Sequence, residues 1–417
     1  MKRWKEETRT IIAGLDIGST KIAVVIGEWH PEEGLVVLGV GMSPPNGWKQ
    51  GLVIDLDQAV ESVRKAVEEA QLTAGVEVKD LVVSIVGDHI RGINSRGVVA
   101  VSGPNREITQ NDVNRVLEAA SAVYLPRDRE IIEVIQQEYI VDSQAGIRNP
   151  IGISGVRLEA EVHLVTGSTS VIDGVVKASE KAGFEVSRIL LGPLASGAAV
   201  LDAHEYELGV VLVDIGGMST DVAVFFDGVV RHSGVIRLGS QHVTNDIAVG
   251  LKTSLDQAED IKKTYGSAHP TALPEEPSFL VSNIGGQTTT EVSCETLRRI
   301  VQPRMEEIFS LVLEEIRRAD YTKKVGAGVV LTGGGALLRG IVPLAEEMLE
   351  MSARLGIPKG FSGLTELASS PVFSSAVGLL LLELRTGGYS SAPKSRLGMQ
   401  KKKDWWEWFQ HFFRNYF

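Results

Sequence analysis

The 417-residue sequence contains a single cysteine, Cys294, and no apolar run long enough to cross a membrane, which takes about 18 residues. One cysteine excludes an internal disulfide and a cysteine-cluster zinc site, and it is typical of proteins in a reducing compartment. Residues 1–7 mix both charge signs and lack the apolar stretch of a signal peptide. We therefore expect a cytosolic protein.

Positive charge is also scarce, because 42 Lys and Arg residues stand against 53 Asp and Glu residues. Binding to a phosphate backbone requires basic surface, so we expect no nucleic-acid partner. The eight histidines are scattered and suggest no catalytic triad. The chain is longer than the roughly 250–300 residues that one hydrophobic core usually serves, which predicts separate lobes with a cleft between them.

Two segments of the chain repeat one pattern, at residues 10–41 and 208–239. Each has an apolar β-branched run, then Asp-Ile-Gly with small hydroxylated residues, then further β runs. Asp16 and Asp214 end the first run of each segment. Two such β-meanders predict an α/β fold with two duplicated lobes around a cleft, whose glycine hairpins face one another.

Paired hairpins of this composition are suited to a nucleotide. Their N–H groups and hydroxyls would contact phosphates, and glycine lets the backbone approach the ligand. Asp16 and Asp214 would hold Mg²⁺ through water, and Lys21 would add a charge beside the terminal phosphates. Simple hairpins capped by aspartate remain the alternative for either segment alone, but the matched pair disfavours it. The predicted phosphate-binding residues are Gly18, Ser19, Thr20, Lys21, Gly216, Gly217, Ser219 and Thr220.

A third motif spans residues 329–340, where a buried strand is followed by Gly333, Gly334 and Gly335. We expect a helix to follow these glycines directly and to continue to about Leu349. A glycine turn at a helix N-terminus can hold a phosphate or a ribose, although packing alone explains such a turn equally well. After two phosphate hairpins, we favour an adenosine-binding loop.

These three motifs, in this order, resemble those of the actin-like ATPase superfamily. The resemblance implies ATP and Mg²⁺ as ligands, and it identifies residues 191–200 as the helix that connects the lobes. Residues 258–262 are similar to a helix that reaches the adenosine, which would make Glu259 and Lys262 nucleotide contacts. An ordinary solvent-exposed ion pair is the alternative for these two residues.

Within the superfamily, residues 10–385 resemble the FtsA family of bacterial cell-division proteins. The similar segments are GLDIGSTKIAVVIGE, the region 87–163, GPLASGAAVL, VDIGGMSTDVAVF, AEDIKKTYG and LTGGGALLRGI. The resemblance implies an actin-like protofilament former that tethers the tubulin-like FtsZ ring to the cytoplasmic face of the cell membrane. Its partners would be the C-terminal peptide of FtsZ, further copies of itself and other divisome proteins.

The sequence departs from this family pattern in two places. Met218 stands where many relatives have a third glycine. Filament-forming relatives have a glutamine or glutamate that positions the attacking water. At the corresponding place in this chain, residues 166–173 offer only hydroxyl groups and Asp173. We therefore expect ATP hydrolysis to be weak or absent, and we assign no catalytic residue.

The resemblance also implies a division of the chain into subdomains. The first lobe comprises residues 8–86, 164–196 and 365–385, with a small α+β domain inserted at 87–163. The second lobe comprises residues 197–230 and 304–364, and its subdomain at 231–303 is the expected FtsZ-binding surface. A linker at 386–403 and an amphipathic helix at 404–417 follow.

The last thirteen residues hold a third of the aromatic side chains of the chain. On a helix, one face would carry Trp405, Trp408, Phe409, Phe412 and Tyr416, directly after the basic Lys401, Lys402 and Lys403. An aromatic face beside lysines is typical of a helix that lies in an anionic membrane surface. The alternative is a helix docked on the body of the protein.

Other functions remain open on the sequence alone. A pilus-assembly scaffold of the PilM type would share the fold and the inserted domain, but it relies on a membrane partner and has no need of an aromatic tail. A cytosolic actin-like ATPase is a further alternative. A chaperone would need a substrate domain after the ATPase, and a sugar kinase would need a carboxylate base in the cleft.

Overall fold

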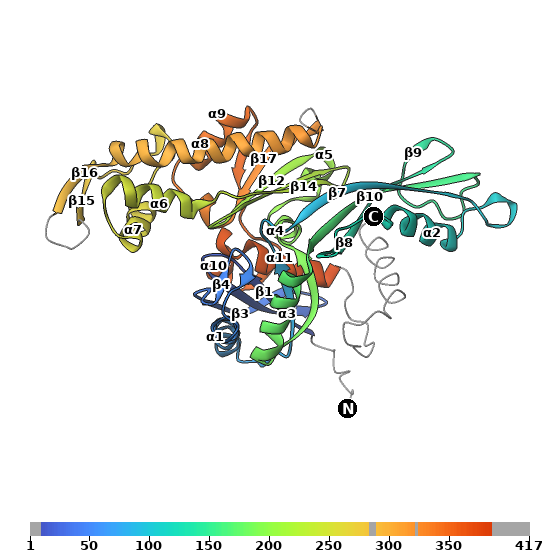
Figure 1. Cartoon of the computed structure of the whole chain (residues 1–417), viewed down its shortest axis with the longest axis horizontal. Helices are drawn as coiled ribbons and strands as arrows, with labels where there is room; N and C mark the ends of the chain where they lie inside the picture. The colour runs from blue at the N-terminus through green and yellow to red at the C-terminus, as the bar shows by residue number, and fades with distance from the viewer. Residues whose placement is uncertain (1–9, 283–288, 322–323, 386–417) are drawn as a thin grey trace.

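The computed structural model describes residues 10–282, 289–321 and 324–385 (Figure 1). The predicted linker and amphipathic helix, including the eight proposed membrane-binding residues, lie outside these ranges. In Figure 1 the second lobe lies above the first, and the inserted domain extends to the right. Within the described ranges, no helix is both long enough and apolar enough to cross a membrane.

The first lobe is built on a six-stranded sheet with the order β11-β6-β1-β2-β3-β19. Helices α1 and α3 pack on one face of this sheet, because alternate residues of β1 such as Ala13 and Leu15 face them. The strands and helices are β1 (Thr10–Ile17), β2 (Ile22–His30), β3 (Gly34–Ser43), α1 (Leu56–Ala74), β6 (Asp80–Ile85), α3 (Thr169–Ala182), β11 (Glu185–Leu191) and β19 (Phe361–Gly363).

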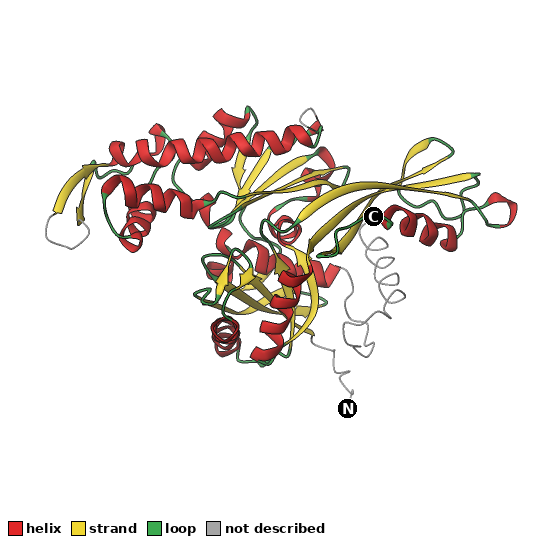
Figure 2. Cartoon of the chain, in the orientation of Figure 1, coloured by secondary structure: helices red, strands yellow, loops and turns green. Residues whose placement is uncertain are grey.

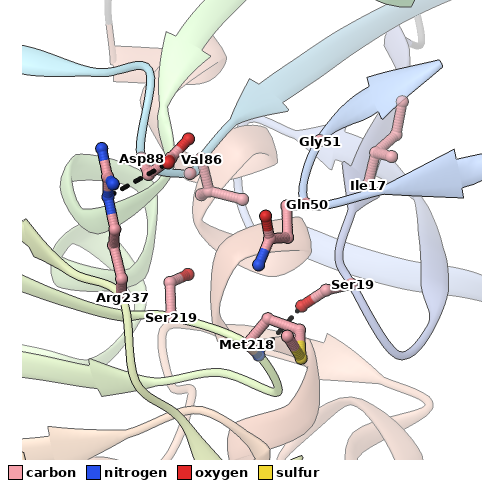
Figure 3. Close-up of a pocket in the computed structure, with 10 residues that line it drawn as sticks. Ile17, Ser19, Gln50, Gly51, Val86, Asp88, Met218, Ser219 and Arg237 are labelled. Carbon is pink, nitrogen blue, oxygen red and sulfur yellow. Dashed lines mark hydrogen bonds and ion pairs between the residues drawn. The ribbon is translucent and has the colours of Figure 1, made fainter. Parts of the chain in front are cut away.

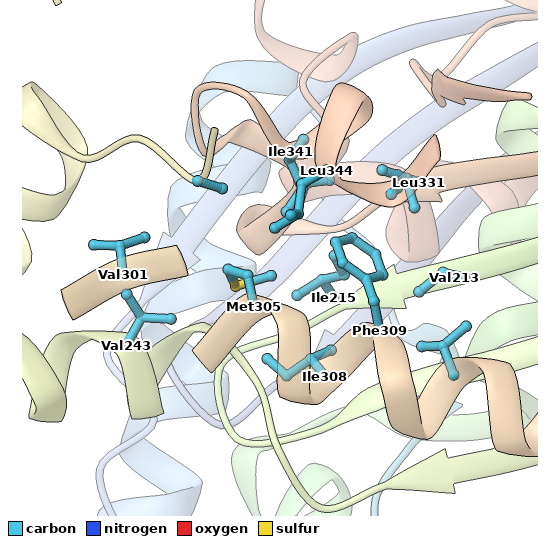
Figure 4. Close-up of a cluster of buried hydrophobic side chains, with 14 of the residues drawn as sticks. Val213, Ile215, Val243, Val301, Met305, Ile308, Phe309, Leu331, Ile341 and Leu344 are labelled. Carbon is cyan, nitrogen blue, oxygen red and sulfur yellow. The ribbon is translucent and has the colours of Figure 1, made fainter. Parts of the chain in front are cut away.

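The second lobe has a five-stranded sheet with the order β14-β13-β12-β17-β18. Its outer face packs on the long helix α8 and on α9, in a core centred on Phe309 (Figure 4). Pro303 lies inside α8, which continues through it. The elements are β12 (Val210–Ile215), β13 (Thr220–Phe226), β14 (Val229–Ile236), α8 (Cys294–Arg318), β17 (Val329–Thr332), α9 (Ile341–Leu349) and β18 (Ala353–Leu355).

The two sheets have the same construction, which confirms the two duplicated α/β lobes predicted from the repeat. In the first lobe, β1 is antiparallel to β2 and parallel to β6, and β2 is antiparallel to β3. In the second lobe, β12 is antiparallel to β13 and parallel to β17, and β13 is antiparallel to β14. Each sheet also gains one more parallel strand on the same side, β11 in the first and β18 in the second.

The remaining elements lie at the edges of the lobes. Figure 2 shows that α6, α7 and the β15–β16 hairpin extend the second lobe away from the inserted domain. Strand β19 pairs with β3, so the chain rejoins the first sheet at Phe361, shortly before the predicted return at residue 365. The elements are β4 (Trp48–Lys49), β5 (Leu52–Val53), α5 (Ala203–Leu208), α6 (Ser240–Leu251), α7 (Leu255–Tyr265), β15 (Ser278–Ser282), β16 (Thr289–Ser293) and α10 (Thr365–Ala368).

The lobes are joined by two helices, α4 (Gly192–Val200) and α11 (Ser374–Arg385), which pack against each other between the sheets. Helix α11 contacts β1 and β2, whereas α4 contacts β12 and β13. At their closest approach, a Cβ atom on Gly378 would lie 1.7 Å from the carbonyl oxygen of Ala195. Only glycine fits there, so the packing of the two lobes depends on this position.

The inserted domain is a four-stranded sheet, β7-β10-β8-β9, with helix α2 on one face. Helix α2 begins with a capping box between Thr109 and Asp112. Strand β10 runs directly into α3, so both ends of the domain connect to the first lobe. The elements are β7 (Arg91–Ala100), α2 (Gln110–Ser121), β8 (Arg129–Val141), β9 (Gln144–Ile147) and β10 (Arg157–Ser168).

The inserted domain also contacts the second lobe, along β14. The Asn94 and Gln137 side chains donate to the carbonyl oxygen of Arg231, at 3.0 and 3.3 Å. The buried ring of His163 bridges the Asn94 amide, at 2.6 Å, and the Ser233 hydroxyl, at 2.8 Å. These hydrogen bonds to Arg231 and Ser233 therefore hold the inserted domain to the second lobe.

Substitution of Gly378 by alanine is expected to destabilise the protein by about 1–3 kcal/mol, because the new methyl group forces α4 and α11 apart. Urea unfolding measures the change. Gly174→Ala in α3 is the control, since its Cβ would meet only side-chain carbons of Val53, the nearer at 3.3 Å, and it should stay within about 1 kcal/mol of the parent. Equal stability of Gly378→Ala and the parent would contradict the predicted packing.

The protein is expected to lose stability in acid through His163. Burial, with a smaller effect of His232, lowers the pKa of His163 to about 3 from an ordinary value near 6.5. The unfolded state therefore takes up a proton between these values, which lowers the free energy of unfolding by about 2 kcal/mol between pH 7 and pH 5. Urea unfolding at both pH values should show this loss in the parent and a smaller one in His163→Gln. Identical pH dependence of the two proteins would contradict it.

Candidate functional site

The two repeated hairpins form the same tight turn. In the first lobe the Gly18 N–H donates to the Lys21 carbonyl oxygen at 2.9 Å, and in the second the Gly216 N–H donates to that of Ser219 at 2.9 Å. A Cβ atom on Gly18 would lie 2.9 Å from the Lys21 carbonyl oxygen, and one on Gly216 would lie 2.9 Å from the Ser219 carbonyl oxygen. Glycine is therefore required at both turns by the backbone itself.

The hairpins meet across the cleft between the lobes, as the repeat predicted. The Met218 N–H donates to the Ser19 hydroxyl at 3.1 Å. Gly217 packs against Thr20, whose Cγ2 would lie 2.3 Å from a Cβ atom at Gly217. Groups from both lobes can therefore contact one ligand here.

Asp16 is held at the end of β1 by a hydroxyl and an ammonium group. Its Oδ1 accepts from the Ser84 hydroxyl at 2.5 Å, because Ser84 lies directly beside it on β6. Its Oδ2 lies 3.4 Å from Lys21 Nζ. Ser84 was missed in the sequence analysis, although a polar residue within the apolar run 81–86 was the available signal.

Asp214 has a matching position at the end of β12. Its carboxylate accepts from the Ser196 hydroxyl at 2.5 Å, and Ser196 in turn lies 2.9 Å from the Ser375 hydroxyl. Burial raises the pKa of Asp214 to about 6, and the charge of Asp16 adds to this effect, while the Ser196 hydrogen bond opposes it. Asp214 is thus a carboxylate whose charged form a nearby cation would stabilise.

A third carboxyl group was not identified from the sequence. Asp221 on β13 lies opposite Asp214 and is buried, and its Oδ1 has no hydrogen-bond partner among the residues that the structure describes. Burial, together with Asp214 and Asp16, raises its pKa well above the ordinary value. Its position as the one charged residue in an apolar strand was the available signal.

The carboxylates and hydroxyls have the chemistry that Mg²⁺ held through its own water would need, and the metal site at Asp16 and Asp214 stays a prediction. In the described ranges no group of three or more His, Cys, Asp or Glu side chains is arranged to bind a metal directly. The hydroxyl groups that donate to the Asp16 and Asp214 carboxylates can also accept hydrogen bonds from such waters.

An open pocket of about 380 Å³ lies in front of the hairpins (Figure 3). The first lobe contributes Gln50, at the tip of the β4–β5 hairpin, and the start of the inserted domain contributes Asp88, directly after β6. The second lobe contributes Arg237, after β14, and its Nε lies 3.1 Å from Asp88 Oδ2. None of these three was predicted. The lining residues are Ile17, Ser19, Gln50, Gly51, Val86, Gly87, Asp88, Met218, Ser219 and Arg237.

Thr220 is not brought to this pocket. Its hydroxyl donates to the carbonyl oxygen of Leu238 at 2.8 Å, and its side chain is fully buried in the second lobe. Ser219, the preceding residue, lines the pocket instead. Side chains alternate along an extended strand, so Ser219 and Thr220 point to opposite faces.

The third glycine motif has a different local structure from the one expected. The residues after Gly333 form a 3₁₀ turn, Gly334–Leu337, and α9 begins only at Ile341. The expected direct continuation into a helix was wrong, because Gly340 adopts a left-handed conformation with φ +72° that separates the two. The motif is therefore a loop.

The three glycines of this motif, Gly333, Gly334 and Gly335, differ in what surrounds them. A Cβ atom on Gly333 would lie 2.2 Å from Asp214 Oδ1, and one on Gly335 would lie 2.4 Å from Ile215 Cγ2. Gly334 is exposed, and its nearest neighbour would be a Val372 side-chain carbon at 3.9 Å. Two glycines thus pack against the end of β12, and the third leaves its backbone open to a ligand.

Glu259 and Lys262 contact each other on α7. Lys262 Nζ lies 2.7 Å from Glu259 Oε2 and 2.8 Å from the hydroxyl of Thr244 on α6. The Lys262 side chain is 11% exposed, and burial lowers its pKa. The pair is therefore a partly buried contact between two helices and differs from the solvent-exposed pair considered as the alternative. Neither residue lines the pocket of Figure 3.

Comparison with known families accounts for most of the chain. The family model "Cell division protein FtsA" matches residues 211–378, and the model "SHS2 domain inserted in FTSA" matches residues 87–166. The FtsA protein of Pseudomonas aeruginosa is 42% identical over 375 residues, which cover 90% of this chain and 89% of the relative. The chain belongs to the FtsA family. The FtsA protein of Borreliella burgdorferi is 40% identical over 412 residues, covering 96% of this chain and all of the relative.

Solved structures outside the FtsA family share the fold. The PilM-PilN type IV pilus biogenesis complex matches 89% of this chain and 97% of its own, with a TM-score of 0.63 at 17% identity. MreB5 of Spiroplasma citri bound to ADP matches 91% of this chain and 97% of its own, with a TM-score of 0.53 at 15% identity. These similarities support the actin-like fold of this FtsA family member. The PilM-type alternative has only this similarity of fold in its favour.

Asp173 is the one carboxylate that the sequence of this FtsA family member offers at the place of the water-positioning residue. It does not line the pocket. No residue of the segment 166–173 lines it. Asp173 instead lies near Glu130, whose pKa is raised by burial and then by the charge of Asp173. The structure therefore does not bring Asp173 to the hairpins.

Replacement of Ser196 by alanine should raise the pKa of Asp214 above its value of about 6, because the carboxylate loses a hydrogen-bond donor. Infrared titration of the carboxyl band, with Asp214→Asn to assign it, measures this pKa. Ser84→Ala removes the donor to Asp16 instead and should leave the Asp214 transition near pH 6. An unchanged transition in Ser196→Ala would contradict the predicted role of the hydroxyl.

Proposed function

We propose that this chain is an ATP-binding scaffold of the cell-division machinery that assembles into actin-like protofilaments and anchors an FtsZ ring to the cytoplasmic side of the cell membrane. The observation that carries the proposal is the meeting of the two hairpins, where Met218 donates to Ser19. Because each hairpin belongs to a different lobe, a ligand bound between them would set the separation of the lobes. A nucleotide could in this way control assembly.

The nucleotide would be ATP with Mg²⁺. Asp16 and Asp214 would hold the metal through water, while the glycine hairpins and Lys21 would contact the phosphates. Gly334 would face the adenosine. Glu259 and Lys262 would exchange their contact with each other for contacts with the adenosine. The absence of a pocket-lining carboxylate in segment 166–173 supports weak or absent hydrolysis, and the catalytic residue is left unassigned.

The FtsZ C-terminal peptide is proposed to bind residues 231–303. In the described part of this region, four large apolar side chains are exposed: Val249 on α6, Leu255 on α7, Leu273, and Leu280 on β15. Such exposure at one end of the molecule supports a docking surface for a peptide (Figure 1). Further copies of the chain and other divisome proteins would occupy other surfaces.

The membrane anchor is proposed to be the segment 404–417, with the lysines before it directed toward anionic lipid. A short amphipathic helix binds weakly alone, and a filament gains avidity by presenting many of them. The protein would therefore be peripheral, at the division site, and assembly and membrane residence would reinforce each other.

Co-sedimentation with anionic liposomes in Mg-ATP tests the anchor. The full chain should pellet with the liposomes, and a chain that ends at Lys403 should stay in the supernatant, because it lacks the aromatic face. Trp408→Glu with Phe412→Glu in the full chain is the matched variant and should also stay soluble. Binding should fall at high salt or with neutral lipid.

The opposite results discriminate between the functions. If both chain lengths remain soluble, the aromatic segment docks on protein, and a pilus-type scaffold becomes the better interpretation. If both chain lengths pellet, the anchor lies elsewhere in the chain. Either result contradicts the proposed anchor.

A further inference from the structure

An ion pair at the mouth of the pocket joins the second lobe to the start of the inserted domain. Asp88 follows β6 of the first lobe, and Arg237 follows β14 of the second, with 3.1 Å between Oδ2 and Nε (Figure 3). Their side chains are 38% and 68% exposed. Exposed ion pairs contribute little to stability, so this pair can exchange partners at low cost.

Arg237 is the cation of this pocket. Among the described residues that line it, Arg237 and Asp88 are the charged ones. Lys21, the other nearby cation, lies beside Asp16 instead. A negatively charged group that entered in front of Ser19 and Ser219 would therefore meet the positive charge of Arg237, which lines the same pocket.

The backbone of Arg237 is fixed to the second hairpin. The next residue, Leu238, accepts the Thr220 hydroxyl, and the Ser240 N–H donates to the Gly216 carbonyl oxygen at 2.9 Å. A Cβ atom on Gly239 would lie 2.6 Å from the Gly217 carbonyl oxygen, so the two segments are in close contact. The guanidinium therefore stays with the proposed phosphate site, whereas Asp88 belongs to the start of the inserted domain, where the chain leaves β6.

A guanidinium binds carboxylate and phosphate oxygens with the same two-pronged geometry. We propose that Arg237 exchanges Asp88 for the terminal phosphate of a bound nucleoside triphosphate, and that a diphosphate leaves the ion pair intact. This inference rests on the proposed nucleotide site. Arg237 is then a ligand of the triphosphate, and Asp88 is its competitor, which lowers triphosphate affinity and ties the second lobe to the inserted domain in the diphosphate state.

The two members of the pair should therefore have opposite effects, which calorimetric titration with Mg-bound ADP and a non-hydrolysable ATP analogue can measure. Arg237→Gln should weaken binding of the triphosphate about tenfold, because a charged hydrogen bond is lost, and leave the diphosphate within about twofold. Asp88→Asn should strengthen triphosphate binding about threefold, because the competitor is removed. The double variant should behave like Arg237→Gln.

A matched control is the ion pair between Glu61 and Arg64 on α1, which is also exposed and has a distance of 2.9 Å. Glu61→Gln and Arg64→Gln should leave both affinities unchanged. If Asp88→Asn and Arg237→Gln shift both nucleotides in the same direction, the pair is only a structural tie and the inference is overturned. If the unaltered chain binds neither nucleotide, the proposed nucleotide site itself fails, and the inference fails with it.

Discussion

The close contact between α4 and α11 is the constraint on which the other features depend. Because Gly378 has no side chain, the helices approach until backbone meets backbone at Ala195. This approach brings Ser196 of α4 within 2.9 Å of Ser375 of α11, and Ser196 then holds the Asp214 carboxylate. The packing that unites the lobes thus also places a carboxylate of the candidate site. The position of the Asp214 carboxylate therefore depends on the packing of these helices as well as on the hairpin that carries it.

Much of the fold could be predicted from the sequence, because it follows from local patterns that occur twice. The β-branched runs and the Asp-Ile-Gly turns defined both meanders, and the structure has the same strand order around Asp16 and Asp214. The glycines at 18 and 216 were also predictable, since a tight turn between two strands needs them wherever the lobes lie.

The features that sequence reasoning missed depend on contacts between distant segments. The hydroxyl of Thr220 was expected in the cleft, but strand alternation directs it to Leu238. The partners Asp88 and Arg237 are 3.1 Å apart in space and far apart in the chain, so no spacing rule relates them. The 3₁₀ turn after Gly333 depends on a single left-handed residue, which composition does not locate.

The inserted domain has a mechanical consequence that follows from its two attachments. It continues into the first lobe through β10 and α3, and it is bonded to β14 of the second lobe through His163. A rotation of one lobe against the other must therefore turn this domain as well. Because the domain extends far from the cleft (Figure 1), a small rotation that turned the domain at its base would become a larger displacement at its tip.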